Sequence, residues 1–225
     1  KPEEKAPEIA ELFSPELRER TWGGLLLAIV ELVSWWSVSA FIPVVSSFLA
    51  ADVVTDPSLL AKTKTEYITI ASTAFNLGGV IGTLLTVPLA LHVGRRPMFF
   101  LYFALSTVAI LITFGLDLAP LTRLCSMALV GVSIFGIFGS FSFYLPELFP
   151  TRLRGTGAGF CYNAGRIVTA AFPFLVGVIV RSGANPLEVL RYVAIAPVIG
   201  LLLLAFGFGP ETRVVEPEVP EPVLP

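Results

Sequence analysis

The sequence is poor in charged residues. Lys, Arg, Asp and Glu make up 14% of its 225 residues, whereas a soluble domain carries about 25%. Because 55% of the residues are hydrophobic, an ordinary soluble domain is excluded. The net charge of −2 does not provide the concentrated basic face that nucleic-acid binding needs, so we expect no nucleic-acid partner.

The sequence also lacks the short motifs of several enzyme classes. It contains no GxxxxGK[ST] phosphate-binding loop and no GxSxG nucleophile turn. Its one histidine, His92, and its two cysteines, Cys125 and Cys161, do not have metal-ligand spacing. We therefore predict that the chain is not an enzyme, has no catalytic residues and needs no metal or cofactor. Both cysteines lie inside apolar stretches, where we expect them to be packing residues.

Six long apolar stretches dominate what is present. Runs of about 20 apolar residues match the hydrocarbon thickness of a bilayer, and spanning runs of this length must be helical to pair their backbone groups. The sequence therefore predicts an all-α membrane protein with a six-helix transmembrane bundle over 22–209. The predicted helices are roughly 22–49, 68–91, 98–116, 121–145, 158–181 and 189–208. We expect a hydrophilic lead-in over 1–21 and a disordered Pro- and Glu-rich tail over 210–225.

The placement of basic residues predicts the orientation. Arg95 and Arg96 share one loop and Arg152 and Arg154 share another, and alternating spans put both loops on the same side. The loop 51–66 on the other side mixes its lysines with acidic residues. Since Lys and Arg favour the cytoplasmic side, we expect these arginine loops and both termini to be cytoplasmic. The chain would lie in the cell (inner or plasma) membrane.

Two ionisable residues lie deep inside predicted spans. Glu31 in the first span and Arg166 in the fifth both lie about 13–15 Å from the cytoplasmic edge at 1.5 Å per residue. A charge at the membrane centre costs at least about 2.5–3.5 kcal/mol on insertion scales. Two interpretations remain open. Either the two residues form a structural ion pair that locks two helices, or they face one polar cavity as a proton-titrating carboxylate (Glu31) and a substrate anchor (Arg166).

Other polar and aromatic residues lie near these two positions. Trp35 shares a helical face with Glu31 by its i, i+4 spacing, and it could stack on a ring or a sugar face. Asn76 in the second span and Asn163 in the fifth carry amides that need partners in lipid, so we expect both to point inward. Whether they meet substrate or another helix remains open. The substrate and proton candidates are Glu31, Trp35, Asn76, Asn163 and Arg166.

Three segments resemble motifs of the major facilitator superfamily. The stretch 146–157, PELFPTRLRGTG, resembles the loop that opens the eleventh helix of these transporters. The sequence GRRP at 94–97 is similar to the end of the motif between their second and third, or eighth and ninth, helices, although Val87 and Leu91 stand where the family has a glycine and an acid. The sequence GPETR at 209–213 resembles the ending of sugar porters.

The resemblance implies a fold, a missing partner and a gate. The chain would form helices seven to twelve, the second half of a twelve-helix major facilitator fold, and would need an amino-terminal six-helix half. The resemblance also assigns a cytoplasmic gate, in which we expect Glu147 to pair with Arg95, Arg96 or Arg154. The gate residues are Arg95, Arg96, Glu147, Arg152 and Arg154.

Two classes of function remain open. The first is a secondary active transporter that carries an organic anion or a sugar-like metabolite by proton-coupled symport and alternating access. Its partners would be the small-molecule substrate, protons, membrane lipid and the missing amino-terminal half. The alternative is a non-transporting membrane protein, either a truncated or degenerate relative or a receptor-like protein. A six-span segment upstream in the same reading frame would distinguish the two.

Overall fold

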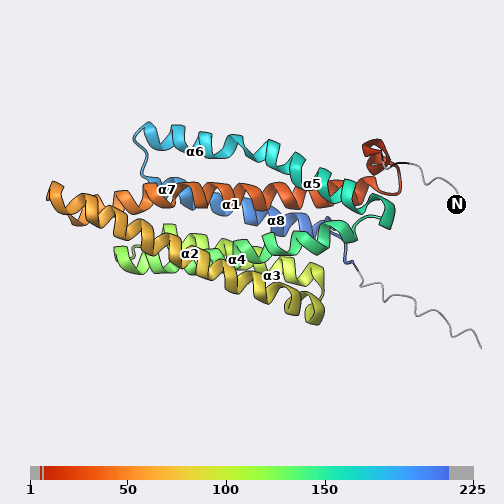
Figure 1. Cartoon of the computed structure of the whole chain (residues 1–225), viewed down its shortest axis with the longest axis horizontal. Helices are drawn as coiled ribbons and strands as arrows, with labels where there is room; N and C mark the ends of the chain where they lie inside the picture. The colour runs from red at the N-terminus through yellow and green to blue at the C-terminus, as the bar shows by residue number, and fades with distance from the viewer. Residues whose placement is uncertain (1–5, 7, 213–225) are drawn as a thin grey trace, which may run out of the picture.

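The described part of the chain is a bundle of long helices. The computed structural model describes residue 6 and residues 8–212. The helices run back and forth along one common axis (Figure 1). The elements are η1 (Ile9–Phe13), α1 (Arg18–Val53), α2 (Pro57–Val93), α3 (Arg95–Gly115), α4 (Pro120–Glu147), η2 (Thr151–Leu153), α5 (Arg154–Thr169), α6 (Ala171–Arg181), α7 (Pro186–Arg191), η3 (Tyr192–Ala194) and α8 (Ile195–Ala205). Within the described residues, six helical segments are long and apolar enough to cross a membrane, which confirms the predicted all-α membrane fold.

The second helix begins earlier than predicted. It starts at Pro57 rather than near residue 68, because polar capping extends it beyond the apolar run. The Asp56 carboxylate accepts hydrogen bonds from the backbone N–H and the hydroxyl of Ser58, at 2.9 and 2.8 Å, and Pro57 occupies the first turn, where its missing N–H costs nothing. Hydropathy marks only the apolar part of such a helix.

Proline interrupts the fifth and sixth spans. The helix that crosses as the fifth span changes from α5 to α6 at Ala170, three residues before Pro173, which cannot donate to the carbonyl of Thr169. The last span contains the short 3-10 turn η3 between α7 and α8, and Pro197 follows it at a similar distance. Each span is therefore two helical pieces in series.

The tightest helix contact is between α2 and α4. A side-chain Cβ added at Gly78 would overlap the backbone carbonyl of Ala128, and one added at Gly82 would overlap that of Val132. Gly131 approaches the α2 backbone at Phe75 in the same way. Close backbone approach through small residues is a main source of helix association in lipid, so these glycines fix the α2–α4 pair.

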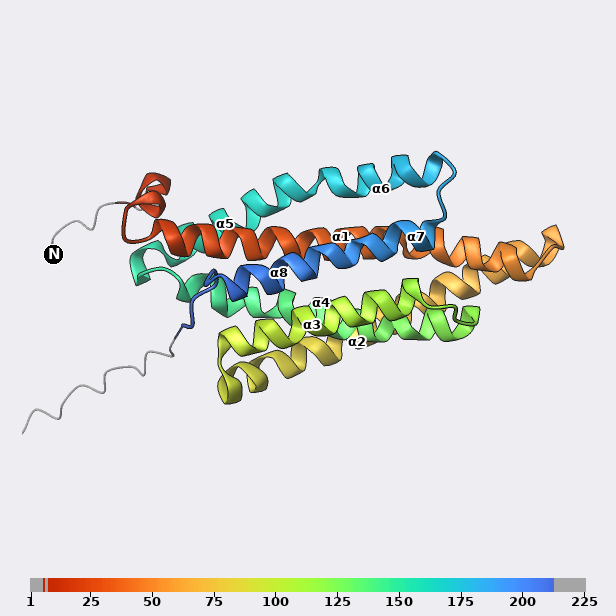
Figure 2. The same cartoon turned by 180° about the vertical axis from the view of Figure 1, so that it is seen from behind.

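The connections divide between the two ends of the bundle. η1, the α2–α3 turn, the connection from α4 to α5 and the end of α8 lie at one end, and the α1–α2, α3–α4 and α6–α7 connections lie at the other (Figures 1 and 2). The two arginine loops therefore share one end with the start of α1 and the end of α8. That this end faces the cytoplasm stays a prediction.

Both predicted polar flanks contain ordered contacts. In the lead-in, Leu12 is fully buried, and its carbonyl accepts a 2.7 Å hydrogen bond from the Thr21 hydroxyl. The prediction of disorder from residue 210 onward is wrong for residues 210–212, because hydrogen bonds to the start of α3 and to the last turns of α4 hold them, as described below. The rest of the predicted tail, 213–225, lies outside the described residues.

Candidate functional site

One face of α1 carries two buried polar groups without partners. The Glu31 side chain is 1% exposed, and its Oε1 atom has no hydrogen-bond partner among the described residues. One turn later, the indole N–H of Trp35 is also buried and without a partner in the described part of the chain. An unsatisfied buried polar group costs about 1–3 kcal/mol. Because two such groups on one helical face reduce the stability of the fold, they mark this face as a candidate functional site.

Aromatic rings connect this face of α1 to α4 and α5. The ring of Trp35 stacks on Phe138 of α4 with centroids 5.9 Å apart and meets Trp36 edge-on at 4.8 Å. Phe138 contacts Tyr162 of α5 edge-on at 6.1 Å. We call Trp35, Trp36, Phe138 and Tyr162 the aromatic cluster. Phe138 is not among the predicted site residues, because the chain has 18 phenylalanines and nothing in the sequence distinguishes this one.

The aromatic cluster ends at Arg166. The guanidinium carbon of Arg166 lies 5.7 Å from the centre of the Tyr162 ring, which is a cation–π contact. Arg166 also lines a groove of about 580 Å³ between α1, α5 and α6, together with Trp36, Asn163, Pro173 and Phe174. The groove is mostly apolar and contains one guanidinium group. Such a surface suits an organic molecule that carries a carboxylate on an apolar or ring-shaped body.

The groove that Arg166 lines does not include Glu31, and the predicted cavity shared by the two residues stays a prediction. Glu31 is buried, whereas Arg166 is exposed in the groove, and no ion pair joins them among the described residues. The reason lies in α5. Gly165 packs against Ala28 and Leu32 of α1, and the next residue of an α-helix points about 100° away. Arg166 therefore projects to the side of α1, and the aromatic cluster connects it to the face of Glu31.

The two asparagines do not point inward as predicted. Asn76 and Asn163 are exposed, and each amide donates to a carbonyl four residues earlier in its own helix, at 2.7 Å (Ser72) and 2.8 Å (Gly159). Because its own helix satisfies the N–H, the amide does not need a partner on another helix. Asn163 still lines the groove beside Arg166, whereas Asn76 does not line it.

The predicted pairing of Glu147 with an arginine is confirmed. Its carboxylate accepts from Arg95 at 2.9 Å (Nη2) and 3.2 Å (Nε), and the Thr212 hydroxyl donates to the same carboxylate. The neighbouring Glu211 carboxylate accepts from the backbone N–H groups of Arg95 and Arg96, at 2.7 and 2.8 Å. We call Arg95, Arg96, Glu147, Glu211 and Thr212 the terminal network. It joins residues 211 and 212 to the start of α3 and the end of α4.

The geometry of Gly94 makes room for this network. Gly94 has a φ of +94°, and a Cβ at this position would lie 3.1 Å from the Glu211 carboxylate oxygens. The carboxylate thus sits at the N-terminus of α3, where the helix dipole and free N–H groups favour an anion. Glycine meets both requirements, the left-handed backbone and the space.

The other predicted gate residues have different partners. The Arg96 guanidinium donates to the carbonyl of Leu204 at 2.6 Å. Arg152 forms an ion pair with Glu11 of η1, so it ties the lead-in to the start of α5. Arg154 is exposed, and no ion pair involves it within the described residues. The structure therefore brings only Arg95, Arg96 and Glu147 of the five predicted gate residues into one network.

Two residues of the terminal network, Glu211 and Thr212, are not among the residues predicted from the sequence. Glu211 and Thr212 were assigned to a disordered tail because proline, glutamate and valine dominate the segment. The available signal was the GPETR sequence at 209–213, which resembles the ending of sugar porters. Tyr144 adds a third contact, since its hydroxyl donates to the carbonyl of Pro210 at 3.1 Å.

Comparisons with known proteins agree with this architecture. The sequence profile of the family described as "Sugar (and other) transporter" matches residues 25–214. A protein of Cupriavidus pinatubonensis named "Probable 4-methylmuconolactone transporter" is 37% identical over 165 residues, which are 70% of this chain and 37% of that protein. The inner membrane metabolite transport protein YdjE of Escherichia coli is 26% identical over 217 residues, 92% of this chain and 43% of that protein.

A third relative has a different named substrate. The sialic acid transporter NanX of Escherichia coli is 29% identical over 163 residues, which are 68% of this chain and 38% of that protein. The chain thus spans less than half the length of each of these relatives.

Proposed function

Because the chain belongs to the sugar (and other) transporter family of the major facilitator superfamily, we propose that it supplies one half of a secondary active transporter. The whole protein would carry an organic anion or a sugar-like metabolite across the inner membrane, together with protons, by alternating access. The chain is an integral membrane protein, because six helical segments in its described part are long and apolar enough to span a bilayer. Its helices would correspond to helices seven to twelve, and the other half would cover the groove.

The observation that carries the proposal is the buried Glu31. A carboxylate that is 1% exposed and has an oxygen atom without a hydrogen-bond partner in the described residues is costly if it only maintains the fold. Proton coupling needs a group that changes its charge when access alternates. Glu31 has the right chemistry, and its neighbour Trp35 connects it through the aromatic cluster to the groove.

The groove supports an anionic substrate. Arg166 provides the guanidinium, and the rings of Trp36 and Phe174 provide apolar surfaces against which a ring-shaped body can pack. The substrates for which two relatives are named agree with this chemistry, since 4-methylmuconolactone and sialic acid are both compact, oxygen-rich ring compounds. The substrate class is therefore proposed as a small ring-bearing organic acid or a sugar acid.

The decisive experiment separates coupling from binding. In the whole protein, Glu31→Gln keeps the shape of the side chain but removes its titration. We expect this variant to lose uphill accumulation of substrate in proteoliposomes with an imposed proton gradient, while counterflow exchange continues. Arg166→Ala should instead raise the substrate concentration needed for half-maximal exchange by about tenfold, since one charge-assisted contact is worth roughly 1.5–3 kcal/mol.

The matched control is Glu66→Gln. Glu66 is an exposed carboxylate near the start of α2, at the other end of the bundle from the terminal network. This variant should accumulate and exchange substrate like the parent. If Glu31→Gln accumulates substrate as well as the control does, Glu31 does not couple transport to protons.

The proposed orientation has a separate test. Single cysteines introduced in 51–66 should react with a membrane-impermeant maleimide added from outside, and cysteines in 92–97 or 146–157 should not. The reason is the arginine pairs in the second group of loops. Labelling of the arginine loops from outside would reverse the assigned orientation.

A further inference from the structure

The guanidinium of Arg166 contacts an aromatic ring and not a carboxylate. Within the described residues its side chain has no ion pair and no hydrogen bond, and its guanidinium carbon lies 5.7 Å from the centre of the Tyr162 ring. A cation–π contact attracts the charge of the guanidinium without using its N–H donors, whereas a bidentate carboxylate would occupy two of them. All five N–H donors of Arg166 therefore remain available to a ligand.

The spacing of these two residues on α5 explains the contact. Tyr162 and Arg166 are four residues apart, so they lie on one face of the helix, and helical side chains lean toward the N-terminus. The Arg166 side chain therefore extends over the Tyr162 ring. A second helix supports this ring, because Phe138 of α4 contacts it edge-on at 6.1 Å. The guanidinium thus lies on a ring that is itself held in place.

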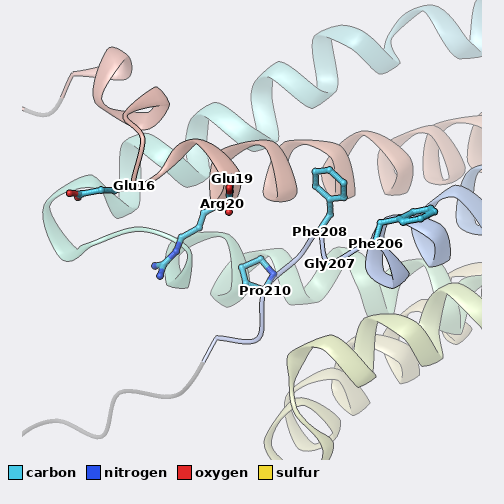
Figure 3. Close-up of a pocket in the computed structure, with 7 residues that line it drawn as sticks. All are labelled: Glu16, Glu19, Arg20, Phe206, Gly207, Phe208 and Pro210. Atoms are coloured by element: carbon cyan, nitrogen blue, oxygen red, sulfur yellow. The ribbon is translucent and has the colours of Figure 1, made fainter.

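The charge of Arg166 is not offset inside its groove, since none of the described residues that line this groove is acidic. The groove at the end of the bundle that carries the terminal network, also of about 580 Å³, is different. Figure 3 shows its arginine, Arg20, between the carboxylates of Glu16 and Glu19. Because these three side chains sum to −1, that groove disfavours an anion. Of these two grooves, only the one with Arg166 presents a net positive charge.

We propose that Tyr162 is a positioning residue for the anion site. Its ring holds the Arg166 guanidinium in the groove and leaves the N–H donors free for the carboxylate of the substrate. Tyr162 is not among the described residues that line the groove, so it acts through Arg166. An arginine side chain loses rotamer freedom when it binds a ligand, and a ring that holds it beforehand reduces that loss. The inference rests on the proposed function, because it takes Arg166 as the substrate anchor.

The aromatic face of Tyr162, and not its hydroxyl, carries this role. Phenylalanine keeps an aromatic face of almost the same size and lacks the hydroxyl, whereas leucine removes the aromatic face and keeps an apolar side chain. The two substitutions therefore separate the cation–π contact from hydrogen bonding and from simple packing. Loss of a cation–π contact at an exposed site corresponds to a change of about two- to fivefold in a binding constant.

Binding is measured on the purified whole protein with two probes of similar shape, the anion cyclohexanecarboxylate and the neutral cyclohexanecarboxamide. Trp36 lines the groove, so its fluorescence reports the binding of either probe. Tyr162→Leu should weaken the binding of the carboxylate about two- to fivefold and leave the binding of the carboxamide unchanged. Tyr162→Phe should bind both probes like the parent.

A double-mutant cycle shows whether the ring acts through the guanidinium. Arg166→Gln should weaken the binding of the carboxylate, and adding Tyr162→Leu to it should have no further effect. Two matched controls lie elsewhere in the chain. Arg20→Gln removes the guanidinium of the other groove, and Tyr192→Leu removes the ring that lies 5.4 Å from the Arg191 guanidinium carbon. Neither control should change the affinity for either probe.

Several results would overturn the positioning role. They are a Tyr162→Leu variant that binds the carboxylate like the parent, an equal loss of affinity for the two probes, a Tyr162→Phe variant as weak as Tyr162→Leu, or an equal loss in Tyr192→Leu. In each of these cases, a weaker carboxylate affinity of Arg166→Gln would leave the proposed anion groove intact. If Arg166→Gln binds the carboxylate like the parent, the anion groove is rejected, and the role of Tyr162 is rejected with it.

Discussion

The ion pair between Arg95 and Glu147 provides a quantitative test of the terminal network. We consider the variants Arg95→Gln and Glu147→Gln, alone and combined, because the double-mutant cycle isolates the energy of the pair from other effects. Glutamine keeps most of the size and hydrogen-bonding capacity of each side chain. The coupling energy then measures the charge interaction rather than a packing defect.

The structure sets the expected size of this coupling. Two contacts of 2.9 and 3.2 Å join the guanidinium to the carboxylate, and the side chains are only 8% and 25% exposed. Exposed pairs contribute about 0.2–1 kcal/mol, whereas hydrogen bonds to charged groups contribute about 1.5–3 kcal/mol. A bidentate, partly buried pair belongs to the second range. We expect a coupling energy of about 2 kcal/mol.

The coupling energy between Arg95 and Glu147 is measured by equilibrium unfolding in mixed micelles, with the fluorescence of the three tryptophans as the signal. The pair Lys62 and Glu66 is the internal control. The Lys62 Nζ and Glu66 Oε1 atoms are 3.8 Å apart, and the two side chains are 75% and 56% exposed. The coupling energy of this pair should therefore be about 0.3–0.5 kcal/mol. If the Arg95–Glu147 coupling is no larger than the control coupling, the geometry of the terminal network is not energetically significant. A gate built on it would then be excluded.

Two further predictions concern packing and capping. Gly78→Leu should destabilise the protein by about 3 kcal/mol or more, because the leucine side chain would collide with the Ala128 backbone. Overpacking costs about 1–3 kcal/mol even where side chains can move. The control Leu77→Ala, at a position 60% exposed, should change the unfolding free energy far less. Asp56→Ala should speed amide hydrogen exchange in the first turn of α2, because hydrogen bonds from the hydroxyl and the backbone N–H of Ser58 lower the pKa of Asp56. Since a lowered pKa means that the folded state favours the charged form, this protection is present at neutral pH and is lost as the pH falls through the lowered pKa.

Each of these predictions has a clear contrary result. Equal unfolding free energies for the two packing variants would mean that α2 and α4 are not held by the close approach at Gly78. For the capping prediction, Asn185 caps α7 in the same way, with its side chain accepting from the N–H of Leu187 at 2.9 Å, but an amide does not titrate. The effect of Asn185→Ala should therefore be independent of pH, and a pH-independent effect of Asp56→Ala would refute the role of its charge.

Some features of this protein follow from the sequence alone. The six spans and the all-α fold follow from hydropathy, because only a helix can pair its own backbone groups within lipid. The pairing of Glu147 with an arginine also follows, since two charged loops on the same side of a bundle are near one another. Hydropathy does not predict the polar start of α2, because it records which residues suit contact with lipid and not how far a helix extends.

The tertiary structure decided which side chains meet. In lipid, apolar residues do not distinguish the inner face of a helix from the outer one, so helix faces are set by close approach at small residues. Gly165 against α1 turns Arg166 away from Glu31 and into the groove, and Gly94 makes room for Glu211 at the start of α3. These contacts join residues remote in sequence. No local pattern could therefore have predicted that Arg166 and Glu31 would separate, and the GPETR sequence at 209–213 does not by itself identify the partners of residues 210–212 in the terminal network.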